Sequence, residues 1–357
     1  MKNQILSNLA KNYFKYKDQH KHASVSKEEK VRLDQAEGLW SKDVKAQLPD
    51  RNSSKVKKTL ANFLGIKPEN ISVFAGADEV IEIIPRLYLN PKQNVIVVTP
   101  TFDRLLTTNL KVGAKVFSFN LAERTHLGLE KSDISKLSKK SRDISAKLIW
   151  LCSPNNPTGQ VIELSTIERI AKDNPKSLVV VNEVYQEYFS LDKGCSSVSL
   201  IDKIPNLIVV RSFSKAFNLA GVRVGYVVSS PEIISHFENF RTMYNLSLYA
   251  QENAVEALSS RNLSDVAVIL NNIEKERERL VRIVKGLDNF EVIEGSRTNF
   301  LFLKHKKKDL FSELYKKNIV VSDWRNAAGV EGKNYVRVSV GQKKQNDKLV
   351  SILKEID

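Results

Sequence analysis

Residues 207–229, LIVVRSFSKAFNLAGVRVGYVVS, contain two apolar segments with a polar one between them. The short β-branched runs predict strands at Leu207–Arg211 and Gly225–Ser229. Lys215 lies in the polar segment, just after the first strand. Taken alone, a lysine after two serines at a strand end is more often a surface residue than a catalytic one. The stretch therefore predicts a strand–loop–strand unit whose function depends on the rest of the chain.

Upstream of this unit, short apolar strands alternate with helical segments, which predicts a large, mainly parallel α/β sheet. The further strands that we expect are Ile71–Ala75, Val95–Thr99, Lys115–Phe119, Leu148–Cys152 and Leu178–Val181. A helix capped by Ser53 or Ser54 should end at Gly65, with an apolar face formed by Val56, Leu60, Phe63 and Leu64.

The pattern changes after Pro231. A long amphipathic helix is expected at Ser264–Leu287, followed by strands at Thr298–Leu303 and Tyr335–Val340. This change indicates a second, smaller α+β domain. We expect an N-terminal arm (1–45) that joins the small domain, a large domain (46–250) and a small C-terminal domain (251–357).

Composition restricts the function classes. The net charge of +15 is spread over the 357 residues, and its short basic runs lack interleaved aromatics, so solvated lysine-rich faces are favoured over nucleic-acid binding. Cys152 and Cys195 form neither a disulfide framework nor a metal-ligand pattern, which favours a cytoplasmic protein without a metal site. No apolar run approaches the roughly 18 residues of a membrane span.

Three motifs follow predicted strands, where open α/β sheets bind their ligands. They are Ser153-Pro154-Asn155-Asn156-Pro157-Thr158-Gly159, Asn182-Glu183-Val184-Tyr185, and Ser212-Phe213-Ser214-Lys215-Ala216-Phe217 with Arg223 beyond it. The first motif alone is equally well explained as a turn. Asn156 and Asn182 are 26 positions apart, Asn182 and Lys215 are 33 apart, and Lys215 and Arg223 are 8 apart.

With this order and spacing, the chain resembles the fold-type-I pyridoxal-phosphate (PLP) aminotransferases, and among them the histidinol-phosphate aminotransferase branch. Gly76-Ala77-Asp78-Glu79 and Tyr335-Val336-Arg337-Val338-Ser339-Val340-Gly341 add to the resemblance, which extends from about Leu33 to the C-terminus. It implies a homodimer with active sites at the subunit interface. It also implies ping-pong transfer of an amino group from a donor such as glutamate to a keto acid or a phosphorylated ketone.

The resemblance assigns Lys215 as the amine that forms a Schiff base with PLP and then moves the substrate's α-proton. Such an amine needs a lowered pKa, which burial near cations provides. The backbone N–H groups of Ala77 and Asp78 would bind the cofactor phosphate at a helix N-terminus. The remaining residues that it implies for this phosphate are Ser212, Ser214 and Arg223.

Other positions match the family's ring and substrate contacts. Phe102 would stack on the pyridine ring. Asn156 and Tyr185 would hydrogen-bond the ring's phenolic oxygen, with Asn156 also near the substrate. Arg337 would bind the substrate carboxylate through a bidentate fork, unless it lies in an edge strand that faces water.

The chain departs from the family at three places. Asn182 stands where the family has an aspartate that pairs with the pyridine nitrogen, which predicts a less protonated cofactor. Leu48 lacks the hydroxyl that reaches the phosphate across a dimer. Ser322 replaces an arginine for the substrate phosphate, and Arg325 is a candidate substitute. Histidinol phosphate is therefore in doubt as the substrate.

Two alternatives remain open. The same residues could serve a PLP-dependent decarboxylase of a phosphorylated amino acid, because motifs do not show which α-bond is cleaved. A catalytically impaired PLP-fold binding protein is the other alternative, suggested by Asn182 and Leu48 but opposed by the joint presence of Lys215, Arg223 and Arg337.

Overall fold

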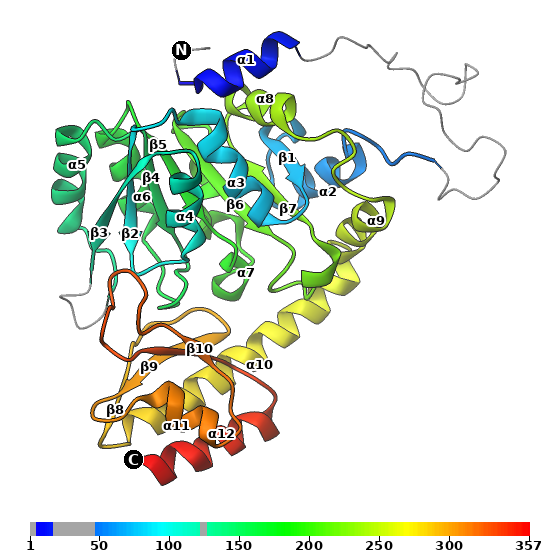
Figure 1. Ribbon diagram of the computed structural model, residues 1–357. Coiled ribbons are helices and arrows are strands. Elements are labelled where there is room, and N and C mark those ends of the chain that lie inside the picture. Colours follow the sequence, from blue (N-terminus) through cyan, green and yellow to red (C-terminus); the bar gives the residue numbers. More distant parts are fainter. Residues whose placement is uncertain (1–4, 17–46, 122–126) are drawn as a thin grey trace.

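The computed structural model describes residues 5–16, 47–121 and 127–357. They form a large domain around a seven-stranded sheet and a smaller domain around a four-stranded sheet (Figure 1). This is the predicted α/β fold class, with a large, mostly parallel sheet and a smaller α+β unit.

The large sheet has the strand order β1-β7-β6-β5-β4-β2-β3. Strand β7 pairs antiparallel with both neighbours, and the other pairs are parallel. The predicted strands are confirmed, each with ends within one residue of the expected ones. The observed bounds are β1 (Ile71–Phe74), β2 (Asn94–Thr99), β3 (Lys115–Asn120), β4 (Leu148–Cys152), β5 (Leu178–Asn182), β6 (Leu207–Ser212) and β7 (Gly225–Val228).

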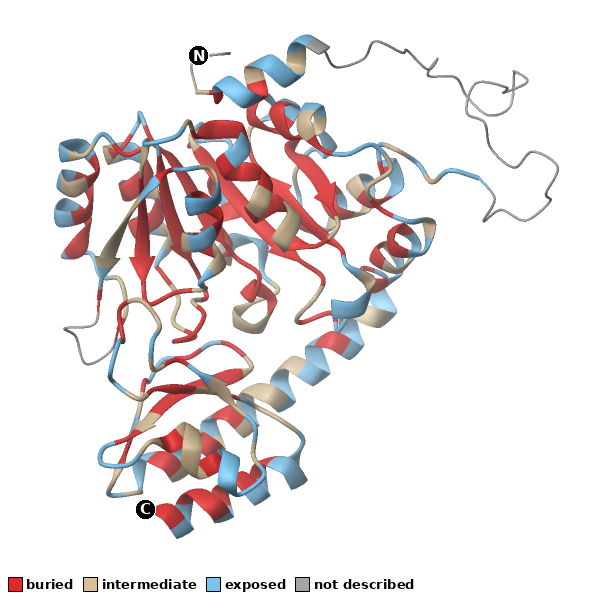
Figure 2. Ribbon diagram, in the orientation of Figure 1, coloured by how far each residue is buried: buried red, intermediate tan, exposed pale blue. Residues whose placement is uncertain are grey.

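Helices cover both faces of this sheet, so β4, β5, β6 and β7 are buried along their whole length (Figure 2). Parallel strands covered in this way read as continuous apolar runs, which is why they could be predicted. One hydrophobic core includes residues of α2 (Ser54–Leu64), α5 (Asp133–Asp143), α6 (Leu164–Asp173) and α9 (Leu248–Ala257). The other includes α1 (Asn8–Tyr16), α3 (Ala77–Tyr88), α4 (Arg104–Lys111) and α8 (Pro231–Phe240).

Ser53, one of the two expected candidates, is the N-cap residue of α2, but it does not cap the helix through its side chain. Ser53 precedes the helix but has φ 48°, and its side chain makes no capping hydrogen bond. The carboxylate of Asp50 instead accepts hydrogen bonds from the backbone N–H groups of Asn52 (2.9 Å) and Ser54 (2.7 Å). A carboxylate can cap from outside the helix because it accepts several N–H donors and favours the positive end of the dipole.

The small domain begins with α10 (Ser260–Lys285), which extends from the large domain along the small one (Figure 1). Its sheet has the antiparallel order β10-β11-β9-β8. The bounds are β8 (Phe290–Val292), β9 (Phe300–His305), β10 (Ser322–Asp323) and β11 (Val336–Ser339), with α11 (Leu310–Lys316) and α12 (Lys343–Ile356) beside the sheet. The predicted long helix and two strands are present, shifted by up to four residues.

Helix α1 packs on the large domain, next to α3 and α8 (Figure 1). Its contact includes the backbone N–H of Ser7, which donates to the carbonyl of Leu87 at 2.6 Å. Residues 5–16 of the predicted N-terminal arm therefore contact the large domain, whereas we expected the arm to join the small one. The rest of the arm lies outside the described residues. None of the described helices is both long enough and apolar enough to cross a membrane.

Candidate active site

A cavity of about 750 Å³, partly open to solvent, lies at the carboxyl ends of the central strands. Every residue that the sequence predicted for the site lines it. The lining residues are Ala77, Asp78, Ile81, Phe102, Asn156, Asn182, Val184, Tyr185, Ser212, Ser214, Lys215, Ala220, Arg223 and Arg337.

Both domains contribute to the cavity. Asn156, Asn182 and Ser212 follow or end β4, β5 and β6, and the parallel register brings these strand ends to one edge of the sheet. Arg337 comes from β11 of the small domain, which is paired on both sides and is not an edge strand. Its Nη1 donates to Asn156 Oδ1 at 2.5 Å, and its guanidinium lies 5.1 Å from the ring centre of Phe300.

Lys215 lies in a turn closed by the Asn218 N–H, which donates to the Lys215 carbonyl at 3.0 Å. Its Nζ is 5.6 Å from the ring centre of Tyr185. Burial lowers the pKa of Lys215, and the positive charges of Arg337 and Arg223 lower it further, against the opposing effect of Asp78. An amine with a lowered pKa is deprotonated in a larger fraction of the molecules near neutral pH, and the deprotonated form has a free electron pair.

Arg223 also lines the cavity and lies beside the N-terminus of α3. It adopts a left-handed backbone (φ 60°), and its Nη1 lies 2.9 Å from the Ala220 carbonyl and 3.4 Å from Ser214 Oγ. Gly225 lets β7 approach this helix closely, because a Cβ atom there would lie 2.3 Å from the backbone nitrogen of Ala77. Serine hydroxyls, a guanidinium and helix N–H groups converge here, which is the donor set of a phosphate site.

The carboxylate of Asp78 is part of an ion-pair chain that sequence reasoning missed. It lies 3.5 Å from Arg223 Nη2 and 3.3 Å from Arg104 Nε. Arg104 in turn pairs with Glu82 at 2.8 Å. The helical spacing of Asp78 and Glu82, i and i+4, was the available signal, since it places both carboxylates on one face of α3.

The residues predicted to bind the cofactor ring also line the cavity. Asn182 is buried, and its Oδ1 accepts a hydrogen bond from the Val184 N–H at 3.3 Å. Burial raises the pKa of the Tyr185 hydroxyl, although Arg337 acts in the opposite direction. Tyr185 is held edge-on against Phe300 at 5.1 Å, so its orientation also depends on the small domain.

The structure also locates the departures from the family. Leu48 is 41% exposed and lies outside the cavity lining. Ser322 pairs with Arg337 across the β10–β11 ladder, and its Oγ accepts a hydrogen bond from Trp324 Nε1 at 3.0 Å. Arg325 does not line the cavity, because its guanidinium pairs with Asp323 (2.7 Å) and Asp309 (2.5 Å).

Three lining residues were not predicted, namely Ile81, Val184 and Ala220. Ile81 is one helical turn after Ala77, so its spacing could have indicated it. Nothing in the sequence distinguishes Val184 or Ala220 from other buried or loop residues.

The residues present fit PLP. A desolvated lysine lies at one point of the cavity and a phosphate donor set at another, while Arg337 Nε is buried without a hydrogen-bond partner among the described residues. An open α/β sheet with this site at its strand ends and a small C-terminal domain over it defines a PLP-dependent transferase of fold type I.

Comparison with known proteins gives the family. The model of the family "Aminotransferase class I and II" matches residues 4–353. Histidinol-phosphate aminotransferases of Brevibacillus brevis and Thermoanaerobacter pseudethanolicus are 32% and 34% identical, over 87% and 86% of this chain and 82% and 84% of theirs. A crystal structure of the Sinorhizobium meliloti histidinol-phosphate aminotransferase with pyridoxal-5'-phosphate has a TM-score of 0.76 at 21% identity, covering 88% of this chain and 84% of that one. The chain belongs to the class I and II aminotransferase family and is a PLP-dependent transaminase.

Proposed function

We propose that this aminotransferase binds PLP at Lys215 and exchanges amino groups between an amino acid and a 2-oxo acid. The observation that carries the proposal is a single cavity that contains both the desolvated amine of Lys215 and the guanidinium of Arg337. PLP supplies an aldehyde that condenses with amines and a ring that withdraws electrons from the substrate's α-carbon.

Each side chain then has a defined task. Arg223, the hydroxyls of Ser212 and Ser214, and the N-terminal N–H groups of α3 bind the phosphate. Phe102 would stack on one face of the ring, and Asn182, Tyr185 and Asn156 are the residues that would hydrogen-bond its edge. The amine of Lys215 is the base of this site: its Nζ would accept the proton from the substrate's α-carbon and hold it for return to the product.

Arg337 is the residue that we propose for the substrate carboxylate. Its present partner is the neutral amide of Asn156, so a carboxylate can replace that contact with a charge-assisted fork without breaking an ion pair. The Arg325 guanidinium is neutralised by two aspartates, so it offers no second anion site at the cavity. A phosphorylated ketone therefore has less support as the acceptor than a 2-oxo acid, although the sequence relatives are named for histidinol phosphate.

We also propose that the chain acts as a homodimer. Leu48, Met243 and Tyr249 are large apolar side chains that are 41–65% exposed. They lie on adjacent segments, since Gln251 Nε2 donates to the Asp50 carbonyl at 2.9 Å. Sedimentation equilibrium tests this proposal, and a monomer at micromolar concentration would contradict it.

The test of the reaction is a half-reaction with the PLP-loaded protein and single amino acids. Transamination predicts one equivalent of 2-oxo acid per active site and an amino group retained by the protein until a 2-oxo acid collects it. Release of carbon dioxide with catalytic turnover and no 2-oxo acid would favour the decarboxylase instead.

A further inference from the structure

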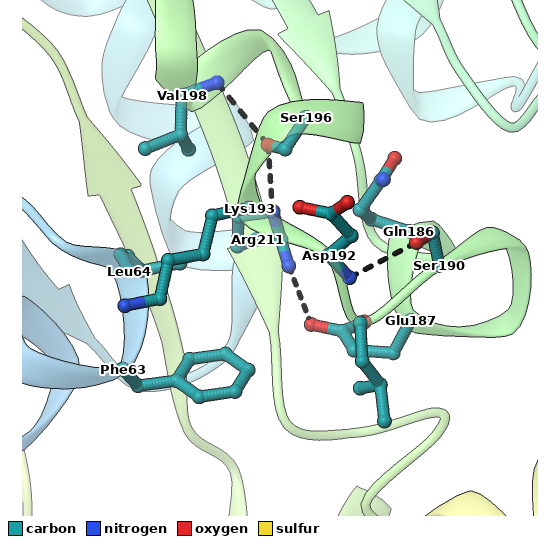
Figure 3. A pocket seen from close by; sticks show the side chains of 11 residues that line it. Phe63, Leu64, Gln186, Glu187, Ser190, Asp192, Lys193, Ser196, Val198 and Arg211 are labelled. Atoms are coloured by element: carbon teal, nitrogen blue, oxygen red, sulfur yellow. Dashed lines mark hydrogen bonds and ion pairs between the residues drawn. The ribbon is translucent and has the colours of Figure 1, made fainter.

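A buried ionic cluster around Arg211 lies at the ends of β5 and β6, and Figure 3 shows Arg211 between Ser196 and Glu187. Arg211 Nη1 donates to Glu183 Oε2 at 3.1 Å and to Ser196 Oγ at 2.9 Å. Its Nη2 donates to Glu187 Oε1 at 2.7 Å. The side chains of Arg211, Glu183 and Glu187 are only 1–3% exposed. No step of the proposed function uses these charges.

The cluster and the cavity occupy opposite faces of the same two strand ends. Along β5 and β6, odd-numbered residues pack in one hydrophobic core and even-numbered residues in the other. Glu183 and Arg211 therefore lie on one face, whereas Asn182 and Ser212 lie on the face that lines the cavity. The Glu183 N–H continues the ladder by donating to the Val210 carbonyl at 2.8 Å.

The two carboxylates that contact Arg211 lie on the chain segment that carries Asn182 and Tyr185. Glu183 and Glu187 flank Tyr185 in the chain, and Arg211 precedes Lys215 by four residues. Ser196 connects the loop that follows α7 (Gln186–Phe189) to the cluster, because its Oγ also donates to Glu183 Oε2 at 2.6 Å. One guanidinium therefore joins the segments that carry Asn182, Tyr185 and Lys215.

The chemistry of the cluster requires an arginine. A planar guanidinium directs its N–H groups to several acceptors in fixed directions, whereas an ammonium group is a compact point charge that cannot reproduce this fork. Buried carboxylates that lose a partner force a local rearrangement, since leaving them uncompensated is strongly unfavourable. A change at Arg211 should therefore move the strand ends that form the cavity floor.

We propose that Arg211 is a positioning residue of the cofactor site: through Glu183 and Glu187 it sets the relative placement of Asn182, Tyr185 and Lys215 from the opposite face of the sheet. This inference rests on the proposed binding of PLP at Lys215.

The first test compares Arg211→Lys with Arg277→Lys. Arg277 is the matched control, because it is also buried (4% exposed) and pairs with Glu274, but it lies on α10 and contacts the Thr298 carbonyl. Arg211→Lys should weaken PLP binding on the order of 10-fold and shift the pH midpoint of the visible band of the lysine-bound cofactor. It should lower kcat on the order of 10-fold or more with little change in KM, because Arg337 is untouched. Arg277→Lys should leave both the PLP affinity and the pH midpoint of the visible band unchanged. The two variants are compared under conditions in which their thermal stabilities are equal.

The second test uses Glu187, which covers the case that Arg211→Lys does not fold. Glu187→Gln keeps an acceptor for Arg211 Nη2 and should bind PLP like the wild type, whereas Glu187→Ala removes the contact and should reproduce the weaker binding and shifted midpoint. Equal defects in Glu187→Gln and Glu187→Ala would overturn positioning in favour of a pure charge effect. Wild-type behaviour of Arg211→Lys would also overturn it. A wild-type protein without a Lys215-dependent visible band would overturn the proposed function itself, and this inference with it.

Discussion

Gly225→Ala should open the phosphate end of the candidate active site. A Cβ atom at residue 225 would lie 2.3 Å from the Ala77 nitrogen and 2.4 Å from the Gly76 carbonyl carbon. Both atoms belong to the backbone, so no side-chain rotation relieves the clash. Reaching an ordinary contact of 3.4 Å requires β7 and the N-terminus of α3 to separate by about 1.1 Å.

The consequences differ for stability and binding. Over-packing of this kind lowers the free energy of unfolding by about 1–3 kcal/mol. A displacement near 1 Å of the phosphate donors should weaken PLP binding on the order of 10- to 100-fold. Chemical denaturation measures the first effect, and titration of the visible absorbance with PLP measures the second.

Gly221→Ala is the control, because a Cβ atom there meets nothing within 4 Å. It should change stability by less than about 0.5 kcal/mol and leave PLP affinity unchanged. If Gly225→Ala binds PLP as tightly as Gly221→Ala, the close approach of β7 to α3 does not support the phosphate site and the reasoning is refuted.

Further variants test single residues. Arg337→Met removes a positive charge near the amine of Lys215, so it should raise the pKa of Lys215 and move the pH dependence of PLP association to higher pH. Asp78→Asn removes a negative charge and should lower the pKa of Lys215, which moves this pH dependence to lower pH. Shifts of the same sign in both variants would contradict this prediction. Arg337→Lys should raise the KM for amino acids about 10- to 100-fold in steady-state assays, since an ammonium cannot form the bidentate fork. Arg325→Ala should leave kcat and KM within about twofold, because Asp309 and Asp323 already hold that guanidinium outside the cavity. Asn182→Asp should increase the single-turnover rate constant of the half-reaction by placing a negative charge where we propose that the pyridine nitrogen binds, and a decrease would show that the site depends on the neutral amide.

The strands of the large sheet and the residues at their ends could be predicted, because both depend on patterns within short segments of the sequence. Strands β4 to β7 are buried on both faces, so each reads as an apolar run, and motifs that end such strands meet at one edge of the sheet. That rule was enough to bring Asn156, Asn182 and Lys215 into one cavity.

Features that depend on contacts distant in sequence could not be predicted. Arg325 is held by Asp309, 16 residues away, and the Arg211 cluster joins residues up to 28 apart. Helix α1 packs next to α3, some 80 residues later in the chain, and Ser7 before α1 donates its hydroxyl to the Arg86 carbonyl at 2.6 Å. No periodicity within a single segment identifies which of several equivalent partners such a residue will choose.

Binding of PLP to Lys215 is tested most directly by locating the cofactor on the chain. The protein is loaded with PLP, reduced with borohydride, digested and mapped by mass spectrometry, beside Lys215→Ala. If Lys215 holds the cofactor, one PLP adduct is expected on Lys215, and both the adduct and the visible band are lost in Lys215→Ala. An adduct on another lysine, or an unchanged band in Lys215→Ala, would contradict it.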